Sequence, residues 1–211
     1  MITQTKETQS SINPSKAIEL LKEGNARFVE NKQASRDLIQ QVNQTASGQY
    51  PFAVVLSCID SRIPTEIVFD QGVGDIFNAR VAGNFVNEDI LGSMEFACKL
   101  AGSKAIVVMG HTACGAVKGA CDHAELGNLT GMLKKIDPAV NAVETADGED
   151  RSSQNADFVN RVAQKNVELT IENIKKMSPV LNEMYENGEI DIVGAMYDVA
   201  SGKVEFNKVL A

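Results

Sequence analysis

Two short motifs contain the residues best suited to chemistry. The first, "SCIDSR", places Cys58, Asp60 and Arg62 within five positions, and the second, "GHTAC", places His111 three residues before Cys114. Cysteine sulfur and histidine nitrogen are ligands that zinc prefers, arranged as a tetrahedron. We therefore expect Cys58, His111 and Cys114 to hold one Zn²⁺ per chain. Three protein ligands leave the fourth position open, as in catalytic zinc sites.

Asp60 and Arg62 decide whether that fourth position stays open. Side chains two residues apart on an extended chain point the same way, so Asp60 could itself ligate the metal. Arg62 offers a fork of donors that can hold the carboxylate in a bidentate pair. With the pair formed, Asp60 can accept a hydrogen bond from a zinc-bound water. We therefore predict that Asp60 and Arg62 form a catalytic dyad.

The charge of the ligand set adds a further expectation. Two thiolates neutralise Zn²⁺, so a bound water should be less acidic than the zinc-bound water of a site with three neutral histidines, whose pKa is about 7. The chain contains only two histidines, so it cannot build a three-histidine site by itself.

Other reactive residues are predicted to be structural. Cys98 and Cys121 fall inside helical patterns and are interpreted as packing residues, and His123 as a solvated residue rather than a proton shuttle. The glycines of "DQGVGD" are a weak signal for a phosphate loop. The net charge of -8 and pI near 4.9 argue against a nucleic-acid partner, since such affinity depends on Lys and Arg neutralising phosphates.

The elements that carry the motifs are predicted from hydrophobic patterns. Short β-branched runs such as "PFAVVLSC" and "KAIVVMGH" are typical of buried strands, and "DIFNARVAGN", "EIDIVGAMYDV" and "KVEFNKVL" complete the set, the last two joined as a hairpin around "ASGK". Amphipathic patterns predict helices at "NPSKAIELLKEGNARFVENK" with a Ser15 cap, "EDILGSMEFACKLAG", "TACGAVKGACDHAEL" and "DFVNRVAQKNVELTIENIKKM". The alternation predicts an α/β fold with a central, mostly parallel sheet flanked by helices. Ligands bind beyond the carboxyl ends of strands in such sheets, where Cys58 and His111 fall.

Length and composition fit one globular domain. The 211 residues, 44% hydrophobic and 23% charged, predict a single domain over 1–211, with 1–45 as an N-terminal helical arm that packs on a neighbouring surface. No run approaches the roughly 18 apolar residues of a membrane span, so no membrane partner is expected. The polar start "MITQTKETQSSINPSK" lacks the apolar core of a secretory signal, which predicts a cytoplasmic protein, or a periplasmic one if a leader has been removed.

Together the motifs resemble the β-class carbonic anhydrases. The resemblance runs from Gln49 to Cys121 and includes "CIDSR", "ARVAGN", "GSMEFA" and "GHTACGAVKG" in that order. It implies a lyase that reversibly hydrates CO₂ to bicarbonate and a proton through attack of zinc-bound hydroxide. It assigns the metal to the Cys58, His111 and Cys114 set, and a substrate pocket to Gln49, Phe77 and the backbone amide of Gly115. It also implies a homodimer or a higher homo-oligomer, in which the arm over 1–45 contacts a second subunit.

Two departures and three alternatives accompany the resemblance. Phe96 stands where plant-type members carry tyrosine, and Gly83 in "RVAGN" departs from the plant-type "RNVAN", which favours a bacterial branch.

One alternative function keeps the zinc and hydrolyses another small heterocumulene, carbon disulfide or carbonyl sulfide. A second is a non-catalytic zinc protein with Asp60 as fourth ligand. The third is a metal-free hydrolase with Cys58 as nucleophile.

Overall fold

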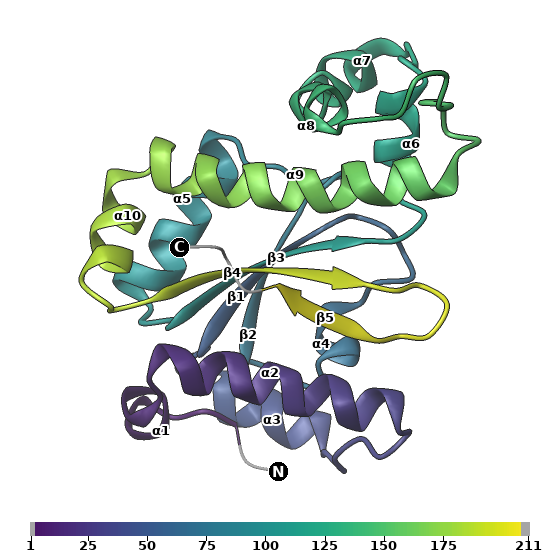
Figure 1. Cartoon of the computed structure of the whole chain (residues 1–211). Helices are drawn as coiled ribbons and strands as arrows, with labels where there is room; N and C mark the ends of the chain where they lie inside the picture. Colours follow the sequence, from purple (N-terminus) through teal and green to yellow (C-terminus); the bar gives the residue numbers. More distant parts are fainter. Residues whose placement is uncertain (1–2, 208–211) are drawn as a thin grey trace.

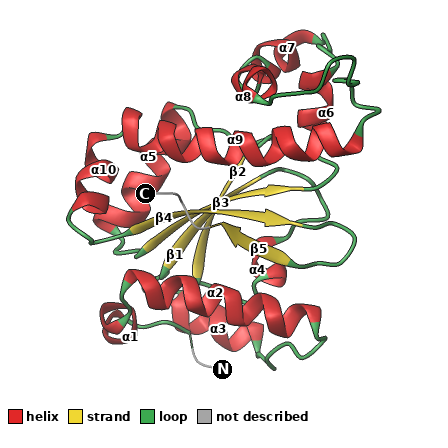
Figure 2. Ribbon diagram, in the orientation of Figure 1, coloured by secondary structure: helices red, strands yellow, loops and turns green. Residues whose placement is uncertain are grey.

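A five-stranded sheet forms the centre of the protein, which a computed structural model describes over residues 3–207 (Figure 1, Figure 2). The strand order is β2-β1-β3-β4-β5, with the first four strands parallel and β5 antiparallel to β4. The strands are β1 Ala53–Ser57, β2 Ile76–Arg80, β3 Ala105–His111, β4 Asp191–Tyr197 and β5 Val204–Asn207. The predicted α/β fold and C-terminal hairpin are confirmed. The end of the last predicted strand, 208–210, and the first two residues of the predicted arm lie outside the described residues.

Helices cover both faces of the sheet (Figure 1). On one face lie α1 Lys6–Ser11, α2 Pro14–Val29 and α3 Leu38–Thr45, and on the other α5 Glu88–Glu95, its π-helical continuation η1 Phe96–Leu100, α9 Ala156–Met177 and α10 Pro179–Glu186. The short α4 Thr65–Val68 follows β1, while α6 Gly115–Cys121, α7 Gly127–Leu133 and α8 Asp137–Ala142 gather beside the start of α9. None of the helices in the described part of the chain is long and apolar enough to cross a bilayer.

The core follows the alternation of side chains along the strands. In β1, Val54 and Leu56 pack with α5, α9 and α10, whereas Ala53 and Val55 contribute to the cluster that includes α2. All five residues of β1 and all seven of β3 are buried. The two central strands are therefore covered on both sides, as their continuous apolar runs predict.

Helix α2 begins earlier than predicted. Its N-cap is Asn13, whose side chain accepts a hydrogen bond from the Lys16 amide, and Pro14 occupies the first helical position. The predicted Ser15 cap is therefore wrong, because Ser15 already lies inside the helix. Ala17 and Leu21 are fully buried, so α2 packs against the sheet of its own chain.

A buried carboxylate anchors the segment after α2. Asp70, whose side chain is 2% exposed, accepts hydrogen bonds from Arg27, Arg36 and the amide of Ala34. Burial alone raises the pKa of Asp70, but these donors outweigh it and leave the pKa below its usual value. The two arginines thus connect the N-terminal segment to the loop after α4.

Asp70→Asn is expected to lower the free energy of unfolding by about 3 kcal/mol, since it removes one member of a buried ion pair. The melting temperature should fall by roughly 6–12 °C at neutral pH. Because the folded pKa lies below the unfolded value of about 3.9, this stabilisation is present at neutral pH and is lost as the pH falls below about 4. Thermal melts of both proteins at pH 7 and in acid measure this.

The matched control is Asp157→Asn, which removes an 82% exposed carboxylate from its i,i+4 pair with Arg161. It should change stability by less than about 0.5 kcal/mol. An Asp70→Asn protein that melts like the control would contradict the anchoring role.

Candidate metal centre

Cys58 lies directly after β1, at the carboxyl end of the sheet. Its side chain is buried, and its sulfur accepts a hydrogen bond from the Gly83 amide at 3.4 Å. Gly83 has φ +82°, and a Cβ there would lie 2.5 Å from the Cδ1 of Ile136. The glycine of "RVAGN" therefore brings its backbone next to the thiol at a point where a side chain has no room.

His111 is the last residue of β3, the neighbour of β1 in the sheet, and is fully buried. Its Nδ1 lies 2.9 Å from the carbonyl oxygen of Thr112. Because a carbonyl only accepts, Nδ1 carries the proton, and Nε2 presents a lone pair. Within residues 3–207, this buried Nε2 has no hydrogen-bond partner.

A strained loop returns Cys114 to the same place. Ala113 adopts φ 55°, a left-handed conformation that is unusual for a residue with a side chain, and its amide donates to Asn160 Oδ1 at 3.2 Å. The Thr112 amide donates to the Tyr197 carbonyl at 2.9 Å. Cys114 then caps α6 and is buried. Contacts from α9 and β4 thus fix the turn between the second and third predicted ligands.

The structure brings the three predicted ligands together. The ligand atoms of Cys58, His111 and Cys114 all lie within 4.8 Å of one another, and all three residues are buried. This donor set, with an unpartnered imidazole nitrogen, is the one zinc prefers. Asp60 is not a member of this group in the part of the chain described, which leaves three protein ligands. The arrangement fits an open zinc site.

The two cysteine side chains shift each other's pKa values in opposite directions. The neighbouring Cys114 side chain is the largest of several contacts that together lower the pKa of Cys58 to about 4. The same contact, together with burial, raises the pKa of Cys114. Backbone amides of Ala116 and Val117 act in the opposite sense on Cys114. A metal ion that binds both sulfurs as thiolates would therefore displace a proton from Cys114.

Asp60 and Arg62 form the predicted bidentate pair. Arg62 Nε donates to Oδ1 at 2.9 Å and Nη2 donates to Oδ2 at 2.7 Å, and the Arg62 amide adds a bond to Oδ1 at 2.9 Å. The Arg62 side chain holds the pKa of Asp60 well below its usual range. Asp60 is therefore an ionised carboxylate that can only accept hydrogen bonds.

The predicted substrate residues lie in different places. Gly115 directly follows Cys114, and the space where its Cβ would stand is open. Gln49 is exposed before the start of β1, at the opposite end of that strand from Cys58. Phe77 pairs in register with Val54, four residues before Cys58 and thus about 13 Å along the strand. One chain alone therefore places Gln49 and Phe77 away from the metal ligands.

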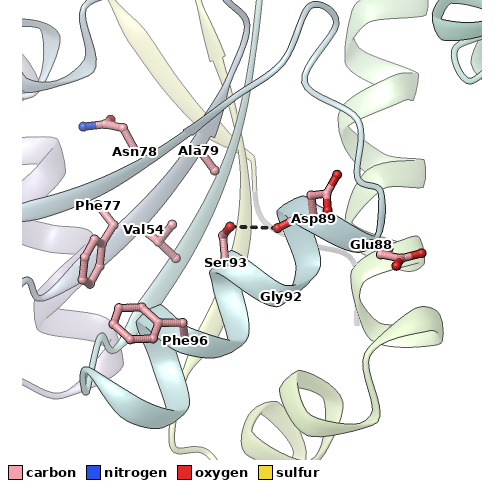
Figure 3. Close-up of a pocket in the computed structure, with 9 residues that line it drawn as sticks. All are labelled: Val54, Phe77, Asn78, Ala79, Glu88, Asp89, Gly92, Ser93 and Phe96. Atoms are coloured by element: carbon pink, nitrogen blue, oxygen red, sulfur yellow. Dashed lines mark hydrogen bonds between the residues drawn. The ribbon is translucent and has the colours of Figure 1, made fainter.

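Phe77 lines an open pocket of about 570 Å³ between β2 and α5 (Figure 3). Its ring meets that of Phe96 edge to face, with centroids 6.1 Å apart, at one end of the pocket. Glu88 and Asp89 lie toward the other end. Phe96 is 51% exposed.

The remaining reactive residues stand apart from the centre. Cys98 and Cys121 are buried, and burial raises their pKa values to about 12 and about 11, as expected of packing thiols. His123 is exposed. Two residues that contact the loops of the centre were not predicted, Asn160 from α9 and Arg80 from β2. Neither position carried a distinguishing signal in the sequence, because both contacts depend on how the elements pack.

Comparisons with known proteins agree with this geometry. Residues 53–204 match a protein-family model described as carbonic anhydrase. "Carbonic anhydrase 2" of Mycobacterium tuberculosis is 35% identical over 197 residues, covering 90% of this chain and 91% of the relative. The solved structure of the β-carbonic anhydrase CafA of Aspergillus fumigatus matches with TM-score 0.70 and 25% identity, covering 93% of this chain and 91% of the other. A structure of tetrameric β-carbonic anhydrases from Sordaria macrospora matches in fold, with TM-score 0.67, 24% identity and coverage of 79% and 89%.

Proposed function

Since the chain belongs to the β-class carbonic anhydrases, whose reaction is the zinc-dependent, reversible hydration of CO₂ to bicarbonate and a proton, we propose that Asp60 and Arg62 direct that reaction at the Cys58–His111–Cys114 centre. The observation that supports this most is the combination of three convergent buried ligands with a carboxylate held beside them by an arginine. The protein is accordingly an enzyme of the lyase class.

Cys58, His111 and Cys114 would hold the zinc ion through two sulfur atoms and Nε2. When bound, zinc supplies Lewis acidity that makes water a nucleophile near neutral pH. The His111 Nδ1 hydrogen bond fixes the tautomer and the orientation of the ring, as outer contacts do in many metal sites.

Asp60 orients the attacking water. An ionised carboxylate only accepts hydrogen bonds, so it takes the hydrogen of the nucleophile and directs its oxygen lone pair toward CO₂. Arg62 engages both carboxylate oxygens and keeps Asp60 from turning to the metal. This arrangement argues against Asp60 as a permanent fourth ligand. A thiol nucleophile without metal would leave the second convergent cysteine without a role.

Gln49 and Phe77 complete the substrate pocket from a second subunit. Gln49 and Phe77 are both remote from the metal ligands of their own chain, whereas Gly115 directly follows the ligand Cys114. The predicted N-terminal arm offers a contact for that subunit, because three apolar side chains of α3 are exposed: Leu38, Ile39 and Val42. The functional unit is accordingly a homodimer, alone or within a larger assembly.

Mixing two defective proteins tests the shared pocket. Cys58→Ser removes a ligand and Gln49→Ala removes the pocket amide, so each homodimer should be impaired. Subunit exchange between them creates heterodimers in which one complete site combines Cys58 of one chain with Gln49 of the other. We expect CO₂ hydration well above the mean of the two parents. Activity equal to that mean, with exchange verified by mass spectrometry, would place Gln49 outside the partner's site.

The substrate is tested by stopped-flow hydration of CO₂ with a pH indicator, alongside carbonyl sulfide and carbon disulfide hydrolysis by the same zinc-loaded protein. We expect rapid CO₂ hydration and much slower turnover of the sulfur compounds. Preferred hydrolysis of either sulfur compound would assign a different substrate to the same centre. A bacterial source and a cytoplasmic location stay predictions.

A further inference from the structure

The turn that carries Cys58 and Asp60 is held by an arginine from the adjacent strand. Arg80, the last residue of β2, donates from Nε to the Cys58 carbonyl at 2.9 Å and from Nη2 to the Asp60 carbonyl at 2.7 Å. One planar guanidinium therefore bridges two carbonyls of the turn, on either side of Ile59.

The position of Arg80 explains why an arginine is needed there. Parallel pairing of β1 with β2 ends at Ser57 and Arg80, and the Val81 amide makes one further bond to the Ser57 carbonyl. Beyond that point the chain of Cys58 leaves the sheet, so its carbonyls have no strand partner. The Arg80 side chain donates to both carbonyls, of which the Asp60 carbonyl also accepts a hydrogen bond from the Ile63 amide at 3.1 Å. A lysine ammonium lacks the rigid fork that reaches both carbonyls at once.

The contacts of Arg80 also exclude a simpler role. Of the ion pairs between described side chains, none includes Arg80, so its charge is not directed at a carboxylate. Among the described residues, its side-chain hydrogen bonds go to the main-chain carbonyls of Cys58 and Asp60, and none goes to the Cys58 sulfur or the Asp60 carboxylate.

We propose that Arg80 is a positioning residue, which fixes the Cys58–Asp60 turn so that the Cys58 sulfur meets the other ligands and the Asp60 carboxylate stays on Arg62. Arg62 restrains the Asp60 side chain, and Arg80 restrains its backbone. The Tyr197 hydroxyl adds a longer contact, at 3.4 Å, to the Arg62 carbonyl. This role rests on the proposed zinc centre, but it concerns how the ligand and carboxylate are held rather than which substrate is converted.

Arg80→Met tests the proposal through metal binding. Zinc affinity, measured by competition with a chromophoric chelator, should fall about tenfold to a hundredfold, the usual effect of losing an outer contact of a metal site. The visible spectrum of the cobalt(II)-loaded protein should change in the same direction as that of Arg62→Met, because both substitutions release Asp60. Arg80→Lys, which can reach one carbonyl, should recover part of the affinity. If Arg80→Met fails to fold, the zinc affinity of Arg80→Lys is the measurement that tests the proposal.

Arg151→Met is the matched control. Arg151 likewise bridges two carbonyls, from Nη2 to Val140 at 2.6 Å and from Nη1 to Val143 at 3.0 Å, but in the segment around α8. Its loss should lower the melting temperature and leave zinc affinity and the cobalt spectrum unchanged. Wild-type zinc affinity with a wild-type cobalt spectrum in Arg80→Met would overturn the proposal. So would an equal loss of affinity in both variants, which would indicate general destabilisation. If wild-type protein binds zinc in an Arg80-dependent way yet does not hydrate CO₂, the proposed function fails and the positioning role stands.

Discussion

Serine in place of Cys114 is expected to abolish stoichiometric zinc binding and reduce CO₂ hydration to the uncatalysed background, a loss of about 10⁶-fold or more. Cys114 is one of three convergent ligands, and its side chain lies close enough to Cys58 to lower the pKa of that thiol. A serine hydroxyl is a poor zinc ligand, and two protein ligands cannot retain the ion. Zinc content after dialysis and stopped-flow hydration on the same sample measure both effects.

Cys121→Ser is the matched control for that substitution. Cys121 is also buried and lies at the end of α6, the helix that Cys114 caps, but it is not a member of the ligand group. It should retain one zinc per chain and most of the activity. A Cys114→Ser protein with full zinc content would contradict the assignment of the third ligand.

Asp60→Asn is expected to reduce kcat by about 10²–10⁴-fold while zinc stays bound. The amide has nearly the shape of the carboxylate, but its nitrogen donates where the proposed mechanism needs an acceptor. Arg62→Ala should also reduce turnover strongly, because it removes both side-chain donors that hold Asp60. Steady-state CO₂ hydration with parallel zinc analysis separates loss of turnover from loss of metal.

Asp157→Asn again provides the control, since its carboxylate pairs with Arg161 at 3.0 Å on the surface of α9. It should hydrate CO₂ at the wild-type rate. Wild-type turnover in Asp60→Asn or Arg62→Ala would show that the dyad has no part in the mechanism. The proposed reaction would then rest on the metal ligands alone.

The sequence predicted the metal ligands because their positions follow from local rules. Apolar β-branched runs place β1 and β3 in the interior of the sheet, and parallel strands bring the residues after them to one edge. His111 and Cys114 are only three positions apart, so one turn can direct both toward Cys58. The Asp60–Arg62 pair was predictable for the same reason, because its two residues are only two positions apart in the chain.

The features that the sequence did not predict depend on contacts between elements distant in the chain, or on a choice between two equally suitable capping residues. Asn13 and Ser15 are both good capping residues, and the hydrophobic pattern of α2 does not choose between positions two apart. Arg80 acquires its role only through the register that sets it opposite Ser57, and Asn160 only because α9 crosses the end of β3. The separation of Gln49 and Phe77 from the ligands likewise follows from their place along the strands.

The most direct test of the zinc-centred account is a zinc titration of metal-stripped protein, with CO₂ hydration measured at each addition. Activity should be at background without metal, rise linearly, and reach its plateau at one zinc per chain. Hydration by the stripped protein at the full rate, or one bound zinc per chain without any hydration, would contradict the account.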